Sequence, residues 1–258
     1  MTEKINNALE LMKNSKFEEA IEAFKDMLDT HSENKAEILN NIGVAYANLG
    51  KLEDAEENFV NSLKVNPMFA QTYINLADLY YKRHELELAI DILLTGEGYL
   101  PEDVVIPHYL ARVYMEDARL DLAIDELDKV LEAQPENYDA YYDLGKVYFD
   151  LGDWASAIAN FESVVEFKKD NALIYYYLGQ AYEANDEIDK AISNYLKALT
   201  INDKFHPAYK KLGILFLARK DYADALEYFN DYMEHDIPQE EIDNTKKIVS
   251  KIEAMMNE

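Results

Sequence analysis

The sequence contains no cysteine, which excludes disulfides, thiolate metal sites and a catalytic thiol. Its five histidines are scattered, with no pair four residues apart and no HExxH motif, so we expect no metal site. GxSxG, GxGxxG and P-loop motifs are also missing, and acidic residues are too numerous for one pair to stand out as acid and base. We therefore expect no catalytic residues and no cofactor, and we expect that the protein is not an enzyme.

No apolar run of 18 residues occurs, so no transmembrane helix is expected. The first residues, MTEKINNALEL, have neither the apolar core nor the small-residue cleavage site of a signal peptide. These two absences predict a cytoplasmic protein.

Basic residues are scarce: 25 lysines and arginines face 51 acidic residues, and the formal net charge is −26. Such a surface repels phosphate backbones and anionic lipid, so we expect neither nucleic acid nor a membrane as a partner. Acidity of this kind keeps a long solvated surface soluble. It would also attract a basic protein partner, and the sequence leaves both interpretations open.

A unit of 34 residues fills most of the chain. In its copy at residues 36–69, Leu39, Ile42, Gly43 and Tyr46 share one helical face, and Pro67 ends a second helix. The second helix has a small residue at the same place in six copies: Ala55, Ala89, Ala123, Ala157, Ala191 and Ala225. A larger side chain would cost about 1–3 kcal/mol there, because two helices cross at this position.

This pattern resembles the tetratricopeptide repeat, whose first helix carries a large residue, Leu, Gly and Tyr at fixed spacing. The later copies match as Tyr73-Leu76-Ala77-Tyr80, Pro107-Leu110-Ala111-Tyr114, Tyr141-Leu144-Gly145-Tyr148, Tyr175-Leu178-Gly179-Tyr182 and Tyr209-Leu212-Gly213-Phe216. The resemblance implies an all-α, right-handed superhelical solenoid of about seven helix-turn-helix units. The expected repeats are 1–35, 36–69, 70–103, 104–137, 138–171, 172–205 and 206–239, followed by a capping helix at 240–258.

Two segments depart from a plain repeat. Gly96 and Gly98 fall inside an expected helix, where each glycine costs about 1 kcal/mol relative to alanine. They predict an early helix end or a kink near Gly96, which is either a flexure between repeats 1–3 and 4–7 or ordinary drift. The tail has an apolar stripe, either the cap of the last repeat or a homodimer contact: Ile242, Ile248, Val249, Ile252, Met255 and Met256.

Helical geometry also predicts a candidate binding surface. Positions 4, 7, 8 and 11 of each first helix pack into the stack, so positions 2, 5, 9, 12 and 13 form a separate stripe, with position 6 at its edge. The resemblance implies that this stripe lines a concave groove for a peptide. The candidate groove residues are Asn41, Asn75, Tyr81, Tyr109, Arg112, Tyr142, Lys146, Phe149, Tyr176 and Tyr177.

Asn41 and Asn75 resemble the asparagine ladder with which some family members hold a peptide main chain, since an amide both donates and accepts. They are otherwise ordinary polar residues of a helix surface. The aromatic residues are typical anchors of binding surfaces, and packing between repeats is the competing explanation. The lysine and asparagine pair of the family's carboxylate clamp is absent from positions 5 and 9, so a chaperone tail is not expected as the ligand.

These residues predict a non-catalytic scaffold that binds a peptide or protein segment in its groove. The alternative is a structural module that self-assembles through the C-terminal helix or the ends of the solenoid. A peptide-sensing regulator or an accessory domain of an enzyme is less consistent with the sequence, because repeats occupy nearly all of it.

Overall fold

A computed structural model describes residues 2–28 and 34–256 of the chain. Within these ranges the chain forms fifteen α-helices and no strand, which confirms the all-α repeat fold. None of these helices is both long and apolar enough to cross a membrane.

The contacts between helices divide the chain into two units, Met1–Asn137 and Tyr138–Glu258. Unit 1 comprises α1 (Thr2–Lys13), α2 (Phe17–Leu28), α3 (Lys35–Asn48), α4 (Leu52–Val65), α5 (Ala70–Lys82), α6 (Leu86–Tyr99), α7 (Val105–Glu116) and α8 (Leu120–Ala133). Unit 2 comprises α9 (Tyr138–Leu151), α10 (Trp154–Phe167), α11 (Ala172–Ala184), α12 (Ile188–Ile201), α13 (His206–Ala218), α14 (Tyr222–Met233) and α15 (Gln239–Met256). The seven repeat ranges and the cap remain our proposal for how the sequence is divided.

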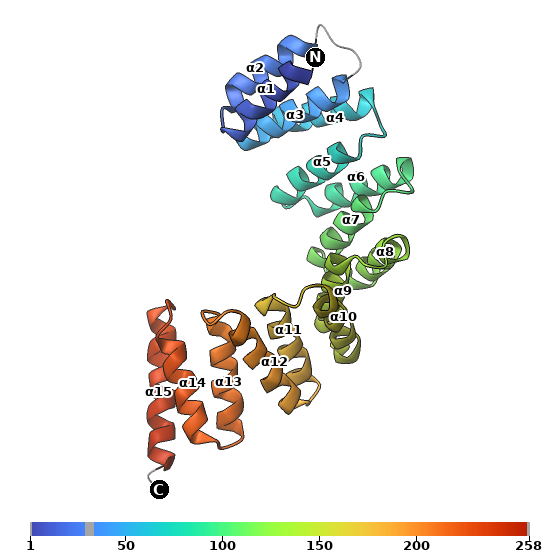
Figure 1. Ribbon diagram of the computed structural model, residues 1–258. Coiled ribbons are helices and arrows are strands. Elements are labelled where there is room, and N and C mark those ends of the chain that lie inside the picture. The colour runs from blue at the N-terminus through green and yellow to red at the C-terminus, as the bar shows by residue number, and fades with distance from the viewer. Residues whose placement is uncertain (1, 29–33, 257–258) are drawn as a thin grey trace. The chain divides into compact units, whose positions relative to one another are not determined.

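Within each unit, consecutive helices form antiparallel pairs, and each pair packs on the next (Figure 1). The alanines expected at the helix crossings are all fully buried. Large side chains fill the space beside them; Phe24 and Phe59 in unit 1 and Phe161 and Tyr195 in unit 2 are at most 1% exposed. The core of each unit is therefore a layer between helices that continues from pair to pair.

Ion pairs join successive helix pairs at the surface. Arg83, which follows α5, contacts Glu56 of α4 at 2.6 Å. Arg119, before α8, contacts Glu87 of α6 in the same way, and Arg219, after α13, contacts Asp189 of α12. Three of the four arginines thus connect their own helix pair to the preceding one.

The helix end expected near Gly96 is wrong. Helix α6 continues through Gly96 and Gly98 to Tyr99. Gly96 is buried, and a Cβ atom there would lie 2.7 Å from Cγ of Tyr73 on α5. The glycine therefore permits close packing of α6 on α5. The boundary between the two units lies at residues 137 and 138, so the contacts do not divide the chain at Gly96.

Helix α15 packs against α14 and covers the apolar side of the last helix pair. Ile252 is 1% exposed and packs with Ala225 and Phe229, and Ile248 and Val249 pack against the same cluster. Three of the six residues of the predicted apolar stripe are thus already in contact with their own unit. Met255 and Met256, at the end of the stripe, are about half exposed.

Candidate functional site

Helices α3, α5 and α7 form one layer in unit 1, and helices α9, α11 and α13 form one layer in unit 2. In unit 1, α3 contacts α5 and α5 contacts α7. In unit 2, the ring of Tyr142 on α9 contacts that of Tyr177 on α11, and Lys211 on α13 pairs with Glu183 on α11 at 3.0 Å. We call the exposed side of this layer the inner face, and the candidate groove residues lie on these helices.

On unit 1, the amide of Asn75 is already bound within the protein. Its Nδ2 donates to Oδ1 of Asn40 at 2.8 Å, and its Oδ1 accepts a hydrogen bond from Gln71 at 3.1 Å. Asn40 is 3% exposed and also accepts from the hydroxyl of Thr72. Asn75 therefore links α5 to α3, whereas Asn41 is half-buried on α3.

Tyr81, Tyr109 and Arg112 lie on α5 and α7 of unit 1. Tyr81 is 38% exposed, and loss of water around it, together with the nearby Glu116 carboxylate, raises its pKa. Arg112 is exposed. The other three arginines each pair with a carboxylate, whereas Arg112 forms no such pair within the part of the chain that the structure describes. This surface therefore presents a tyrosine ring and a guanidinium group to solvent.

On unit 2, the predicted groove tyrosines belong to an aromatic cluster that spans four helices. Tyr177 stacks on Phe161 of α10, with ring centroids 5.6 Å apart, and its edge meets Tyr142 at 5.8 Å. Tyr176 contacts Tyr177 at 6.3 Å and Tyr195 of α12 at 5.6 Å. Packing between repeats is thus a real role of these rings.

The same tyrosines are nevertheless only half-buried. Burial is the main cause that raises the pKa of both Tyr142 and Tyr176, and the Tyr177 hydroxyl adds to the effect at Tyr142. Both phenols therefore stay neutral through the physiological range. They offer neutral hydroxyl groups and partly exposed ring faces to a ligand.

Lys146 and Phe149 complete the inner face of unit 2. The ammonium of Lys146, one turn beyond Tyr142 on α9, lies 5.7 Å from the centre of the Tyr142 ring. Phe149 packs edge-on against Trp154, the single tryptophan of the sequence, at 5.1 Å. A cation and five aromatic side chains therefore lie on or next to this surface.

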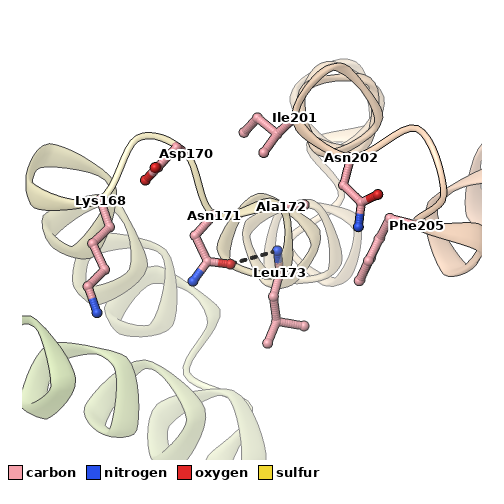
Figure 2. Close-up of a pocket in the computed structure, with 8 residues that line it drawn as sticks. All are labelled: Lys168, Asp170, Asn171, Ala172, Leu173, Ile201, Asn202 and Phe205. Carbon is pink, nitrogen blue, oxygen red and sulfur yellow. Dashed lines mark hydrogen bonds between the residues drawn. The ribbon is translucent and has the colours of Figure 1, made fainter.

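A hollow of about 490 Å³ lies at the loops that precede α11 and α13 (Figure 2). Its lining combines apolar, amide and charged side chains: Lys168, Asp170, Asn171, Ala172, Leu173, Ile201, Asn202 and Phe205. Asn171 caps α11 through a 3.0 Å hydrogen bond from the backbone N–H of Leu173, which Figure 2 shows as a dashed line. Leu173 remains 38% exposed.

The hollow is continuous with the aromatic cluster. Phe205, which lines the hollow, meets the edge of Tyr176 with ring centroids 5.3 Å apart. A line of ring contacts therefore runs from Phe205 through Tyr176 and Tyr177 to Tyr142, beside Lys146. The helix-stripe argument missed this extension, because the hollow combines helix ends with loop residues, which no single helical periodicity brings together.

Among residues 2–28 and 34–256, no three histidine or carboxylate side chains are grouped so that they could hold a metal ion.

Comparison with protein families decides the class of the chain. Family models for the tetratricopeptide repeat match residues 36–69, 114–159 and 172–205, and a TPR repeat model matches residues 145–186. The chain is a tetratricopeptide repeat (TPR) protein. Proteins of this family are generally non-catalytic interaction modules. The comparison with curated proteins found no match to this TPR chain.

Solved structures share the fold. The C-terminal part of a TPR repeat-containing protein from Cytophaga hutchinsonii superposes with a TM-score of 0.75 at 19% identity, over 93% of this chain and 98% of that one. A structure of MamA from residue 41 to its end, from Desulfovibrio magneticus, gives 0.61 at 25% identity, over 64% of this chain and 93% of that one. YrrB, a TPR protein with an unusual peptide-binding site, gives 0.59 at 20% identity, over 78% and 99%.

Proposed function

We propose that this TPR protein is a scaffold that binds a segment of another protein on its inner face. The observation that carries the proposal is the line of half-buried rings on unit 2 that connects the hollow beside Leu173 with Lys146. Partly exposed tyrosines supply large contact area at low cost in side-chain entropy, and for that reason they recur as anchors in protein interfaces.

The hollow gives such a segment a place for one apolar side chain. Leu173, Ile201 and Phe205 supply apolar walls, and Asn171 and Asn202 supply amides at the rim. Burial of a leucine-sized side chain contributes about 1.5–3 kcal/mol, enough to matter in a peptide complex. The bound main chain would then cross Tyr176 and Tyr177.

On unit 1 the proposal assigns the contacts to Asn41, Tyr81, Tyr109 and Arg112. Asn75 fits a supporting role better than a direct one, because both ends of its amide are occupied by Asn40 and Gln71. YrrB shares the fold and has a peptide-binding site, which is consistent with the proposal. The argument itself depends on the side chains of this chain.

The test uses peptides selected from a random displayed library on the full chain. A selected peptide is resynthesised with a benzophenone amino acid at successive positions, irradiated in complex, and the cross-linked residues are located by mass spectrometry. We expect cross-links on α9, on α11 and in the loops around Leu173 and Phe205.

Two outcomes overturn the proposal. One is the failure of the library to yield any peptide that binds the folded chain. The other is cross-linking confined to the even-numbered helices α10, α12 and α14, which would place the peptide outside the inner face.

A further inference from the structure

We infer that the segment bound by unit 2 carries a carboxylate group that pairs with Lys146. This inference rests on the proposed function and adds the chemistry of the partner. It differs from the general expectation that a protein of net charge −26 attracts basic partners.

The half-buried lysines of unit 2 are Lys146, Lys168 and Lys211. Lys168 pairs with Asp139 at 3.7 Å, and Lys211 pairs with Glu183 at 3.0 Å. Within the described residues, Lys146 has no carboxylate oxygen within 4.0 Å of its ammonium, although acidic residues outnumber basic ones two to one in the sequence. A partly desolvated cation without a counter-charge is a site for an anion.

The two carboxylates closest to Lys146 along α9 do not fill this role. Asp143 lies one turn before it but is 8% exposed and is engaged in another interaction. Asp150 lies one turn after it and is exposed, yet it forms no ion pair with Lys146. The contact the structure gives Lys146 is the Tyr142 ring, which attracts the ammonium without neutralising it.

The surroundings favour a single carboxylate over a highly charged anion. The ring of Tyr142 covers one side of the Lys146 ammonium, which strengthens one charge-assisted hydrogen bond. The acidic surface elsewhere repels a group with several negative charges. A peptide with one acidic residue and one apolar residue for the hollow satisfies both conditions.

The experiment compares peptide selections on four versions of the full chain: the natural sequence, Lys146→Met, Lys146→Arg and Lys197→Met. Lys197→Met is the matched control, since Lys197 is an exposed lysine on α12 of the same unit. In the library the peptides are fused at their C-termini, so only Asp and Glu side chains supply carboxylates. A second arm measures one selected peptide with a free or an amidated C-terminus, which separates a side-chain carboxylate from a terminal one.

We expect enrichment of Asp or Glu at one position on the natural sequence, Lys146→Arg and Lys197→Met, and its loss on Lys146→Met. The affinity of an acidic selected peptide should fall about tenfold to a hundredfold on Lys146→Met, as for loss of a charged hydrogen bond. If the carboxylate comes only from a free C-terminus, the library shows no enrichment of Asp or Glu, and amidation lowers the affinity of the peptide. That result also supports pairing with Lys146, provided that amidation no longer lowers the affinity on Lys146→Met.

Two outcomes overturn the inference and leave the proposed function standing. In one, the selected peptides bind without any carboxylate; in the other, they still need the carboxylate on Lys146→Met. A folded chain that selects no peptide overturns the proposed function, and the inference with it. Circular dichroism melting of each variant shows that a loss of binding is not a loss of fold.

Discussion

A Cβ atom placed on Gly145 would lie 2.5 Å from Cε1 of Phe161, so the glycine and the ring fit only as a pair. The same relationship recurs in three other helix pairs: Gly43 with Phe59, Gly179 with Tyr195, and Gly213 with Phe229. Where alanine replaces the glycine, at Ala77 and Ala111, the residue corresponding to the ring is Leu93 and Leu127. The first helix pair is the exception, because Ala8 and Phe24 occupy these two places there; in the later pairs the size of one residue follows the size of the other.

This pairing predicts a compensating double substitution. Gly145→Ala alone should destabilise unit 2 by about 1–3 kcal/mol, because the added methyl group overlaps the Phe161 ring. In the double variant Gly145→Ala, Phe161→Leu, which copies the Ala77 and Leu93 pair, the two effects should be less than additive by about 0.5–3 kcal/mol. Denaturant unfolding of the four proteins measures the coupling, and strictly additive values would show that the two residues do not constrain each other.

The two glycines of α6 should respond to alanine with opposite signs. Gly96→Ala should destabilise the protein, since its Cβ would meet Tyr73 at 2.7 Å. Gly98 is exposed and has no atom within 4 Å of a built Cβ, so Gly98→Ala should stabilise α6 by about 1 kcal/mol through helix propensity. Thermal unfolding measures the change in melting temperature of both variants. A change in the same direction for both would argue against close packing at Gly96.

The phenol of Tyr80 predicts a loss of stability in alkaline solution. Burial and a 3.0 Å hydrogen bond to Glu56 raise its pKa to about 12. The folded-state pKa lies above the unfolded value of about 10. The neutral Tyr80 phenol therefore contributes fully to the free energy of unfolding below about pH 10, and this stabilisation is lost between about pH 10 and 12. Tyr80→Phe should therefore be less stable than the natural sequence at neutral pH. The gap should close above about pH 10, and a constant gap in melting temperature would refute this assignment.

Glu126 predicts a change of stability on the acidic side. It is 7% exposed on α8, and burial raises its pKa despite hydrogen bonds from Lys129. A raised carboxyl pKa favours the folded state at low pH, and this advantage is lost as the pH rises through the folded-state value. Glu126→Gln should therefore gain stability relative to the natural sequence as the pH rises above the unfolded-state carboxyl pKa of about 4.3.

Glu132→Gln, an exposed change on the same helix, is the control for the Glu126 experiment. It should show little change of relative stability with pH. Equal behaviour of the two variants in thermal unfolding would mean that burial of Glu126 does not govern the effect.

The sequence alone was sufficient for the fold, because the 34-residue period places alanines at each crossing and aromatic rings beside small residues. The predicted helix end near Gly96 was wrong, because helix propensity counts a glycine inside a helix as destabilising. The close approach of Tyr73 to Gly96 can be seen only in the three-dimensional structure. The candidate tyrosines lie on the expected helices. Their contacts with Phe161, Tyr195 and Phe205 could not be predicted, because helical periodicity fixes the face of a side chain and not its neighbours on other helices.

The hollow escaped prediction for a related reason. Leu173, Ile201 and Phe205 come from the start of one helix, the end of another and a loop, and no spacing in the sequence links them. Asn40 occupies position 5 of the repeat at 36–69, which the helical pattern assigns to the groove stripe, yet it is buried and bonded to Thr72 and Asn75. Its position next to the packing stripe gave no signal of that burial.

The most direct test of the binding surface uses two leucines of equal exposure. Leu173 lines the hollow and Leu196 lies on α12, and each is 38% exposed. Calorimetric titration of a selected peptide should show affinity about tenfold or more weaker for Leu173→Ser, as expected for loss of a leucine contact, and unchanged for Leu196→Ser. Equal affinities for the two variants would contradict the proposal that the hollow and the adjoining rings of unit 2 receive the partner.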